Sequence, residues 1–417
     1  MAVGSRFRLV RLGDPGLFWA VIALSIFGIA MVYSAGVLDV PSPFVRGAWR
    51  LQLLWFVLAM LLFPLVLRVP VMWLEFAAKP AYVIAMIMLF LTPIIGTGAG
   101  TAEGVPRWIA FGPIRIHTAE IAKIATILML AHVLGQWREA PRTLWALWKP
   151  IILVLIPMAG VMAQPDIGTT LVMAFILIAC LYWAGTPLST LFFLCSPALG
   201  FILAFNYQWW AIWMVLLALL LFLARDAKIS ERASIFVANA MAGTVAIPLW
   251  ESLADYQKNR ILVFLDPSVD PRGAGYNLIQ SRVAVGSGGL TGKGFGDGTQ
   301  KRLAFLPEQH TDFIFAVVGE EVGFIGAALV ILTFGYVFWR LIRIAADAKD
   351  PFAAIVPFGI FGSWFVHVLV NTGMTVGIMP ITGIPLPFIS YGGSFLLVNI
   401  LNMAIVQRIA AENRGLG

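Results

Sequence analysis

Charged residues are scarce in this sequence: Asp, Glu, Lys and Arg together make up 12% of its 417 residues. A soluble domain carries roughly 25% charged residues, so this shortage excludes an ordinary soluble protein. Hydrophobic residues account for 60%, and the mean hydropathy is +0.90. We therefore expect an all-α, polytopic membrane bundle. No tandem repeat or soluble domain is visible, so residues 1–417 are treated as one membrane domain.

Cysteine is almost missing as well, because only Cys180 and Cys195 are present and both lie in apolar segments. This excludes a disulfide framework, and the cysteines do not indicate whether the compartment is oxidising or reducing. No zinc-ligand cluster and no Ser/His/Asp order is evident. The net charge of +7 would suggest nucleic acid in a soluble chain. Here the basic residues lie mainly in short loops, which is the usual bias of cytoplasmic loops, so no nucleic-acid partner is expected.

Long apolar runs are abundant, and runs of about 18 to 22 residues suffice to cross a bilayer. About twelve such segments are predicted. They are 16–36, 48–68, 76–96, 118–136, 149–163, 167–185, 188–205, 208–225, 233–252, 313–340, 351–374 and 389–410.

The charge of the loops predicts the orientation. Basic residues gather on one side of these segments, which places both termini in the cytoplasm. Arg6, Arg8 and Arg11 precede the first segment without a convincing cleavage site, so that segment is read as a retained span. The remaining loops then face outward, and they are 37–47, 97–117, 164–166, 253–312 and 375–388.

The outward loop 253–312 and the residues just after it hold most of the polar chemistry. It shows little obvious secondary structure, and loops of this length are usually functional or disordered. Its aromatic residues argue against disorder. The glycine-dense run 286–298 lacks the spacing of a nucleotide-binding loop. It remains either a close approach to a sugar or lipid diphosphate, with Lys293 nearby, or a flexible loop.

Asp312 is the principal candidate for catalysis. It follows Thr311, a plausible N-cap, and opens the next apolar helix, so it is either an acid that stabilises a helix start or a base at the membrane boundary. Partial burial would raise its pKa towards neutrality. Glu308 and His310 either orient Asp312, touch the substrate, or are ordinary loop residues.

Other outward loops add further candidates. Glu120 and Lys123, three residues apart at the start of a span, form either a structural ion pair or part of a substrate cavity. Asp166 either caps a turn or faces the same cavity as Asp312. Arg107 beside Trp108 is either a diphosphate ligand or an interfacial anchor.

The polar stretch and the start of the next helix contain a series of motifs, which are Gly275-Tyr276, Gln280-Ser281, Gly286–Leu290, Gly292–Gly294, Gly298–Gln300, Leu306–Phe315 and Glu320–Gly323. These motifs resemble those of the SEDS (shape, elongation, division, sporulation) membrane glycosyltransferases, and they are closer to the RodA (elongation) branch than to the FtsW (division) branch. The family usually has ten spans, so 188–225 reads as an extra hairpin or as one kinked span split in two. The pattern before Glu120 also departs from the family's.

The resemblance implies a peptidoglycan glycosyltransferase that polymerises lipid II on the outer face of the bacterial cytoplasmic membrane. Asp312 matches the family's essential aspartate, and the implied transfer inverts the anomeric centre. Arg107, Arg115 and Lys293 are candidate ligands of the leaving diphosphate. Ser390, in the motif 383–394, either packs or touches substrate. The implied partner is a class B penicillin-binding protein, and a divalent cation (Mg²⁺ or Mn²⁺) on the diphosphate stays open.

Two other classes of function remain. A lipid II flippase would use Glu120, Lys123, Glu320 and Glu321 as a polar path, although no inverted repeat is visible. A non-catalytic scaffold for a transpeptidase would tolerate changes at Asp312.

Overall fold

The computed structural model describes most of the chain. The N-terminal Arg6, Arg8 and Arg11, and Leu306–Pro307 of the polar stretch, lie outside the described residues. The described ranges are 12–38, 45, 47–98, 106–112, 114–139, 141, 143–224, 228–253, 255–270, 273–302 and 308–415.

Twelve apolar helices correspond to the predicted spans, which confirms the all-α membrane bundle. Among the described residues, nine spans are long and apolar enough to cross a membrane, α5 only together with the 3-10 turn before it (Leu144–Met162), and α6, α7 and α8 are shorter. The helices are α1 (Pro15–Ala35), α2 (Ala48–Leu67), α3 (Val71–Ile95), α4 (Thr118–Gly135), α5 (Trp148–Met162), α6 (Ile167–Trp183), α7 (Leu188–Leu203), α8 (Tyr207–Leu223), α9 (Ile229–Ser252), α13 (Ile314–Ala346), α14 (Pro351–Val376) and α15 (Gly393–Asn413).

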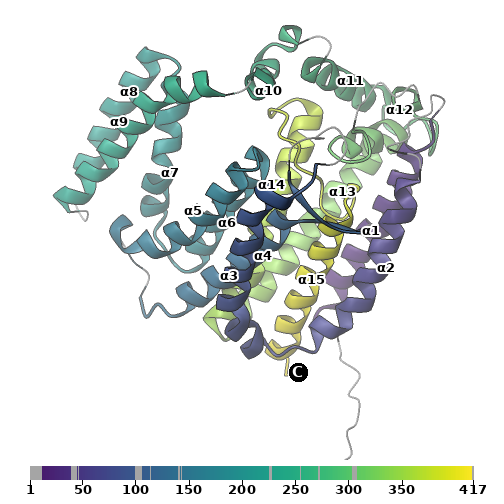
Figure 1. Ribbon diagram of the computed structural model, residues 1–417, viewed down its shortest axis with the longest axis horizontal. Helices are drawn as coiled ribbons and strands as arrows, with labels where there is room; N and C mark the ends of the chain where they lie inside the picture. The colour runs from purple at the N-terminus through teal and green to yellow at the C-terminus, as the bar shows by residue number, and fades with distance from the viewer. Residues whose placement is uncertain are drawn as a thin grey trace, which may run out of the picture.

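Helices α4, α14 and α15 form the centre of the bundle, because most of their residues are buried. The helices around them, such as α2, α3 and α5, leave large apolar side chains exposed. In a bilayer these side chains face hydrocarbon, and the backbone polar groups are satisfied within each helix. The helices run side by side between two ends, with the C-terminus at one of them (Figure 1).

The predicted extra hairpin is a pair of separate helices. Helices α7 and α8 lie at the edge of the molecule and pack with α9 around a small core of their own (Figure 1). Within it, Asn239 of α9 accepts a hydrogen bond from Trp213 Nε1 and donates one to Ser196 Oγ. Glu231 at the start of α9 accepts from Leu144 N, in the short 3-10 helix η2 (Leu144–Leu147). The alternative of one kinked span is therefore wrong.

A small hairpin, which the sequence analysis did not predict, precedes α4. Strands β1 (Trp108–Phe111) and β2 (Ile114–His117) pair antiparallel, with Trp108 opposite His117. Thr97, just after α3, donates its N–H to Trp108 O at 2.8 Å. The hairpin thus joins the ends of α3 and α4 and sets the positions of the residues that follow α3.

The polar loop 253–312 is largely helical, which corrects the expectation of little secondary structure. Its helices mix polar with apolar residues and contain no long apolar run, so they were not recognised in the sequence. Ser281 Oγ and Arg282 attach α11 to the end of α14 through the carbonyls of Thr375 and Gly377. This region covers the end of the bundle opposite the C-terminus (Figure 1). Its elements are α10 (Asp255–Leu265), the 3-10 helix η3 (Pro267–Val269), α11 (Ala274–Ser287) and α12 (Thr299–Arg302).

Helix α13 is broken at Gly323, whereas the sequence predicted one span over 313–340. Gly323 has φ 67° and ψ −166°, a conformation that L side chains rarely adopt. Any Cβ there would lie 2.3 Å from Gly292 N. The glycine run fills the break: Lys293 N and Gly294 N donate to the carbonyls of Glu320 and Glu321. The run is therefore a structural element packed on α13, and the interpretation as a flexible loop is wrong.

Two glutamates before this break attach the polar region to the bundle. Glu321 forms an ion pair with Lys301, and both side chains are fully buried. Lys301 also donates to Ser34 O at 2.7 Å, and Ser34 Oγ donates to Glu321, so α1, α12 and α13 meet at this point. Burial lowers the pKa of Lys301, while Glu321 opposes that shift. Glu320 accepts from Lys293 Nζ at 2.8 Å and from Gln300 N at 3.0 Å.

Replacing Lys301 with Met is expected to destabilise the protein, because it leaves the Glu321 carboxylate buried without its cation. Breaking a buried pair from one side costs about 3–5 kcal/mol. Thermal unfolding of the detergent-solubilised protein measures this as a lower transition temperature. The control is Arg302→Ala, which removes an exposed ion pair with Asp297 and is worth about 1 kcal/mol or less. Equal transitions for the two variants would contradict the role of the buried pair.

Candidate active site

The turn 308–313 holds Asp312 through its backbone. The Glu308 carbonyl accepts from the N–H groups of both Thr311 and Asp312 at 3.1 Å. Ser390 Oγ donates to Thr311 O at 2.6 Å, and Asn371 Nδ2 donates to Asp312 O at 2.8 Å. Asp312 is therefore placed by contacts from its own turn, from α14 and from the segment between α14 and α15.

Thr311 is not the N-cap of α13, which corrects the sequence prediction. Phe313 occupies the cap position and the helix begins at Ile314. The Thr311 hydroxyl instead lies within hydrogen-bond distance of Glu308 O and Glu308 Oε2. Glu308 itself has φ 54°, so the turn takes its shape from an uncommon backbone conformation at this residue. Asp312 thus lies in a non-helical turn just before the helix.

The electrostatic surroundings raise the pKa of Asp312 to about 7. Burial is the largest cause and the negative charge of Glu308 the next, while Asp166 adds a smaller effect in the same direction. Arg260 of α10 and Arg107 act in the opposite direction, because their positive charges favour the carboxylate. Asp312 is thus close to two acids and two guanidinium groups that come from four parts of the chain.

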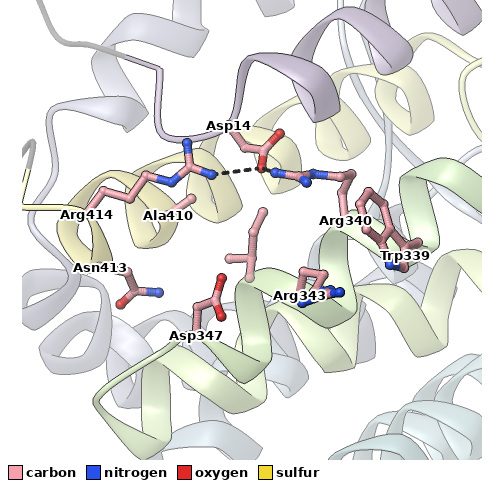
Figure 2. Close-up of a pocket in the computed structure, with 9 residues that line it drawn as sticks. Asp14, Trp339, Arg340, Arg343, Asp347, Ala410, Asn413 and Arg414 are labelled. Atoms are coloured by element: carbon pink, nitrogen blue, oxygen red, sulfur yellow. Dashed lines mark hydrogen bonds and ion pairs between the residues drawn. The ribbon is translucent and has the colours of Figure 1, made fainter.

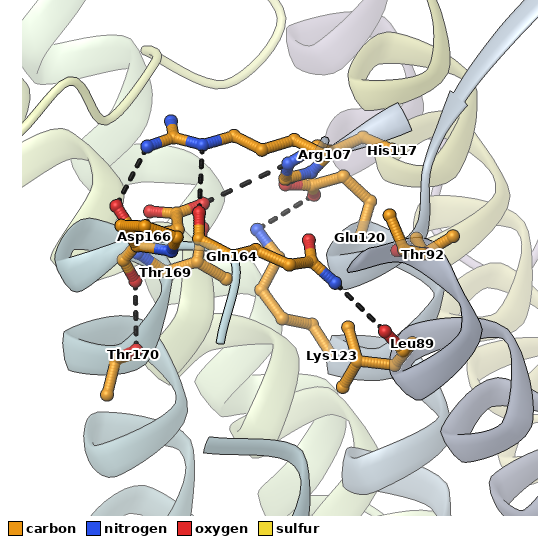
Figure 3. A network of polar contacts seen from close by, with 12 residues as sticks. Leu89, Thr92, Arg107, His117, Glu120, Lys123, Gln164, Asp166, Thr169 and Thr170 are labelled. Atoms are coloured by element: carbon orange, nitrogen blue, oxygen red, sulfur yellow. Dashed lines mark hydrogen bonds and ion pairs between the residues drawn. The ribbon is translucent and has the colours of Figure 1, made fainter. Parts of the chain in front are cut away.

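Asp166 and Arg107 are both anchored in the structure. Asp166 caps α6 by accepting from Thr169 N at 3.0 Å and Thr169 Oγ1 at 2.7 Å. Arg107 donates to the carbonyls of Gln164 at 3.1 Å and Pro165 at 2.8 Å (Figure 3). The turn-capping interpretation of Asp166 therefore holds together with its proximity to Asp312. Two of the guanidinium nitrogens of Arg107 support the loop before α6.

A buried polar chain continues from Asp166 into the bundle. His117 lies 3.9 Å from Asp166 and 3.7 Å from Glu120, and Glu120 forms a 2.8 Å ion pair with Lys123 (Figure 3). Lys123 Nζ is 2.9 Å from His367 Nε2, in the middle of α14. Ionisable groups at membrane depth usually pair or line a cavity. Here Glu120 and Lys123 form an ion pair, and this series of polar side chains connects α4, α6 and α14.

The motif between α14 and α15 contains Ser390, and His310 and Arg115 lie close to it. Ser390 is fully buried, and its hydroxyl accepts from Leu386 N at 2.7 Å, so its contacts are structural. His310 is buried with its ring 5.3 Å from that of Tyr391. Burial lowers the pKa of His310 and raises that of Tyr391. Arg115 on β2 is exposed, and its charge counteracts the shift at Tyr391.

Lys293 lies elsewhere. Its ammonium group contacts Glu320 and Thr299 at 2.8 Å, in the region that fills the break in α13. Among the described residues, none of its hydrogen bonds or ion pairs is with Asp312. Of the predicted site residues, the structure groups Glu308, Asp166 and Arg107 around Asp312, and it places Lys293 apart.

Comparison with known proteins assigns the chain to a family. The sequence model of the FtsW/RodA/SpoVE cell cycle proteins matches residues 15–213 and 198–415. The chain belongs to this family. The two matches overlap at residues 198–213, within the hairpin of α7 and α8 (residues 188–223).

Members of the FtsW/RodA/SpoVE family with curated names match over nearly the whole chain. The peptidoglycan glycosyltransferase MrdB of Escherichia coli K12 is 33% identical, over 96% of this chain and 94% of that protein. The peptidoglycan glycosyltransferase RodA of Treponema pallidum is 32% identical, over 98% and 99%. A probable FtsW of Trichlorobacter lovleyi is 34% identical, over 97% and 94%. These identities are too close to separate the elongation branch from the division branch.

Solved structures of the family share the fold. A chain from a structure described as a peptidoglycan synthase complex that coordinates polymerization and crosslinking superposes with a TM-score of 0.70 at 25% identity, covering 96% of this chain and 98% of that one. RodA of Thermus thermophilus superposes with a TM-score of 0.62 at 23% identity, covering 96% and 97%. The second likeness concerns the fold alone.

Sequence reasoning missed several residues that shape the site of this FtsW/RodA/SpoVE member. Neither Arg260 nor His117 was named as a candidate. His367 carried a usable signal, because a lone histidine inside an apolar span is costly unless it has partners. Gly383 belongs to the motif 383–394 and Asn371 precedes it on α14, but their closeness to Asp312 depends on the tertiary fold.

Gly383 provides a test of the site geometry. A Cβ at this position would lie 3.3 Å from Asp312 Oδ2, and the residue has φ +73°. Gly383→Ala is expected to shift the carboxylate and to lower glycan polymerisation about tenfold or more, since small misplacements are costly in catalysis.

Gly296→Ala is the matched control. Gly296 has φ +86° and nothing within 4 Å of an added Cβ, so it carries similar backbone strain without touching the site. Equal polymerisation rates in the two purified variants would refute the proposed contact.

Proposed function

We propose that Asp312 is the general base of glycosyl transfer from a lipid-diphosphate-linked donor. The protein is a membrane peptidoglycan glycosyltransferase, like its curated relatives. The observation that carries the assignment of the base is the environment of Asp312: a half-buried carboxyl group, fixed by its backbone, whose pKa is raised to about 7. A general base is most effective when its pKa is close to the working pH.

The proposed substrate is lipid II, used both as donor and as acceptor. The Asp312 carboxylate takes the proton from the 4-hydroxyl of the acceptor GlcNAc while that oxygen attacks the anomeric carbon of the donor MurNAc. The bond between this carbon and the diphosphate oxygen breaks, and undecaprenyl diphosphate leaves with the electron pair. The single displacement converts the α-linkage to β, and Asp312 afterwards releases its proton to water. No second carboxylate is needed as a nucleophile, unlike in a retaining reaction.

The leaving diphosphate needs positive charge close to it. Arg115 is exposed on β2 and fits this role well. Arg107 is close to Asp312 but already supports two carbonyls, and Lys293 is held by Glu320. We therefore favour Arg115, with Arg107 and Arg260 shaping the field at Asp312. A Mg²⁺ or Mn²⁺ ion on the diphosphate remains part of this proposal.

The orientation follows from the distribution of charge. The ends of α13 and α15 carry Arg340, Arg343, Arg408 and Arg414, which favours the cytoplasmic side for that end. Both termini then lie in the cytoplasm, and Asp312 lies at the outer face of the cytoplasmic membrane.

The structural relative from a polymerising and crosslinking complex supports a class B penicillin-binding protein as partner. The proposed role in elongation rests on the motifs of the polar stretch, whose sequence is closer to the RodA branch than to the FtsW branch.

The flippase alternative finds little support in the structure. It would use Glu120, Lys123, Glu320 and Glu321 as a polar path through the membrane. Glu320 and Glu321 are instead buried and engaged by Lys293 and Lys301, and Glu120 and Lys123 are paired with each other. A scaffold without chemistry would give no reason for an acid with a raised pKa at this position.

Asp312→Asn is expected to lower polymerisation of purified lipid II by about 10²–10⁴, because it removes the base while keeping size and shape. Glycan strands separated on a gel measure the rate. Asp297→Asn, which alters an exposed acid of the same polar region, is expected to keep wild-type activity. Full activity in the Asp312 variant would remove this residue from the mechanism.

The value of kcat/KM for lipid II, which reports the pKa of the free enzyme, is expected to rise with pH and to level off. The base must be deprotonated, and its pKa is about 7, so activity is low at pH 6 and near its maximum above pH 8. Glu308→Gln removes a negative charge that raises this pKa, so the rise moves to lower pH. The pH profile should keep its wild-type midpoint in Asp297→Asn. A flat profile, or a shift to higher pH in Glu308→Gln, would contradict the assignment.

A further inference from the structure

A basic pocket lies at the end of the bundle opposite Asp312, and the glycosyl transfer makes no use of it. It has a volume of about 540 Å³ and is bounded by the start of α1 and the ends of α13 and α15. Figure 2 shows Arg340 and Arg414 reaching Asp14 from opposite sides. The residues that line it are Asp14, Trp339, Arg340, Arg343, Ile344, Asp347, Ala410, Asn413 and Arg414.

The charges that face this pocket are unbalanced. Three guanidinium groups, of Arg340, Arg343 and Arg414, face the two carboxylates of Asp14 and Asp347. Asp14 is already engaged, since it forms ion pairs with Arg340 and, at 3.6 Å, with Arg414, and it caps α1. Within the described part of the chain, Arg343 forms no ion pair. The pocket thus keeps a net positive charge that the described residues leave uncompensated.

Two buried hydrogen-bond donors in the same pocket lack acceptors. These are Arg340 Nε and Asn413 Nδ2, neither of which has a hydrogen-bond partner among the described residues. Buried polar groups are nearly always paired, so such groups indicate a missing partner. The partner must supply several acceptor oxygens and negative charge. A phosphate group has both properties, and guanidinium groups bind it with charge-assisted hydrogen bonds.

The surface next to the pocket indicates where the phosphate comes from. Trp339, on α13, is exposed and has Arg340 and Arg343 over its ring at 5.1 and 5.5 Å. Towards the middle of the helix, apolar side chains repeat at intervals of three to four residues and form one exposed stripe. Aromatic residues are enriched at the level of lipid headgroups, and the apolar stripe matches acyl chains. The stripe consists of Ile325, Leu329, Leu332 and Tyr336.

We infer that this pocket binds the phosphate of an anionic phospholipid in the cytoplasmic leaflet, with the acyl chains lying along the stripe on α13. Basic pockets between membrane helices on that side suit anionic headgroups. Arg343 supplies the guanidinium group that is free of ion pairs, and Arg340 and Asn413 supply the donors that lack acceptors. The site lies at the opposite end from Asp312 and does not depend on the proposed mechanism.

Native mass spectrometry of the detergent-purified full chain tests the site. The probes are dioctanoyl phosphatidylglycerol, dioctanoyl phosphatidylcholine and inorganic phosphate, each titrated separately. The wild-type protein is expected to bind phosphatidylglycerol at least tenfold more tightly than the other two. Arg343→Gln is expected to weaken that binding about tenfold, the effect of losing one charge-assisted contact.

Three further variants make the outcome decisive. Arg414→Gln removes a second cation from another helix and should also weaken binding, so the test survives if Arg343→Gln fails to fold. Arg343→Lys keeps the charge and should recover part of the affinity. Arg138→Gln removes an exposed arginine at the same face, outside the pocket, and should bind as the wild type does. Equal affinity for phosphatidylcholine, equal affinity for inorganic phosphate, or an equal loss in Arg138→Gln would each overturn the proposal.

Discussion

The peptide group of Asp312 is held from outside its own turn, and the arrangement of this end of the bundle depends on it. Asn371 of α14 donates at once to Asp312 O and to Ile384 O. It thereby ties the turn 308–313 to the segment that leads to α15. Ser390 does the same one residue earlier through Thr311 O. A carboxylate carried on so constrained a backbone has little freedom to move towards solvent, which is how burial can act on its pKa.

The break in α13 is possible because another segment pairs the backbone groups that the break leaves free. Interrupting a helix there exposes carbonyl and N–H groups that lipid cannot satisfy. In this protein the glycine run supplies the partners: Phe324 N donates to Gly289 O and Ile325 N to Leu290 O. Only glycines allow the two backbones to approach this closely, because a Cβ on Gly292 would lie 2.1 Å from Glu321 O. The polar region and the helix that begins beside Asp312 therefore form one structural unit.

The sequence predicted the large features well, for reasons that can be stated. Apolar run length and loop charge are local properties, so the twelve helices and the grouping of basic residues could be read directly. The helix α11 could not, because its buried apolar residues, Leu278 and Ala284, are few and stand among polar ones. The break at Gly323 was invisible for the opposite reason: an apolar run on both sides looks continuous, and only the contact with Gly292 reveals it.

For the candidate site too, local features could be predicted from the sequence and contacts between distant elements could not. Asp312, Glu308 and the pair of Glu120 and Lys123 were found by residue type and spacing. Lys293 was predicted as a diphosphate ligand, whereas in the structure its ammonium group is paired with Glu320, on a helix that starts beyond Asp312. Arg260 was overlooked because nothing local links α10 with the turn 308–313. Charges that act across elements become visible only when the fold is known.

The balance of charge around Asp312 has a consequence for the order of events. Glu308 and Asp166 raise its pKa, and Arg260 and Arg107 lower it, so burial decides the outcome. A donor diphosphate close to these arginines would compensate part of their positive charge. Its arrival would therefore raise the pKa of Asp312 further and make the carboxylate a stronger base when the acceptor hydroxyl is in place. Departure of the diphosphate would reverse this effect and favour release of the proton. The protonation state of Asp312 would thus depend on whether the donor diphosphate is bound.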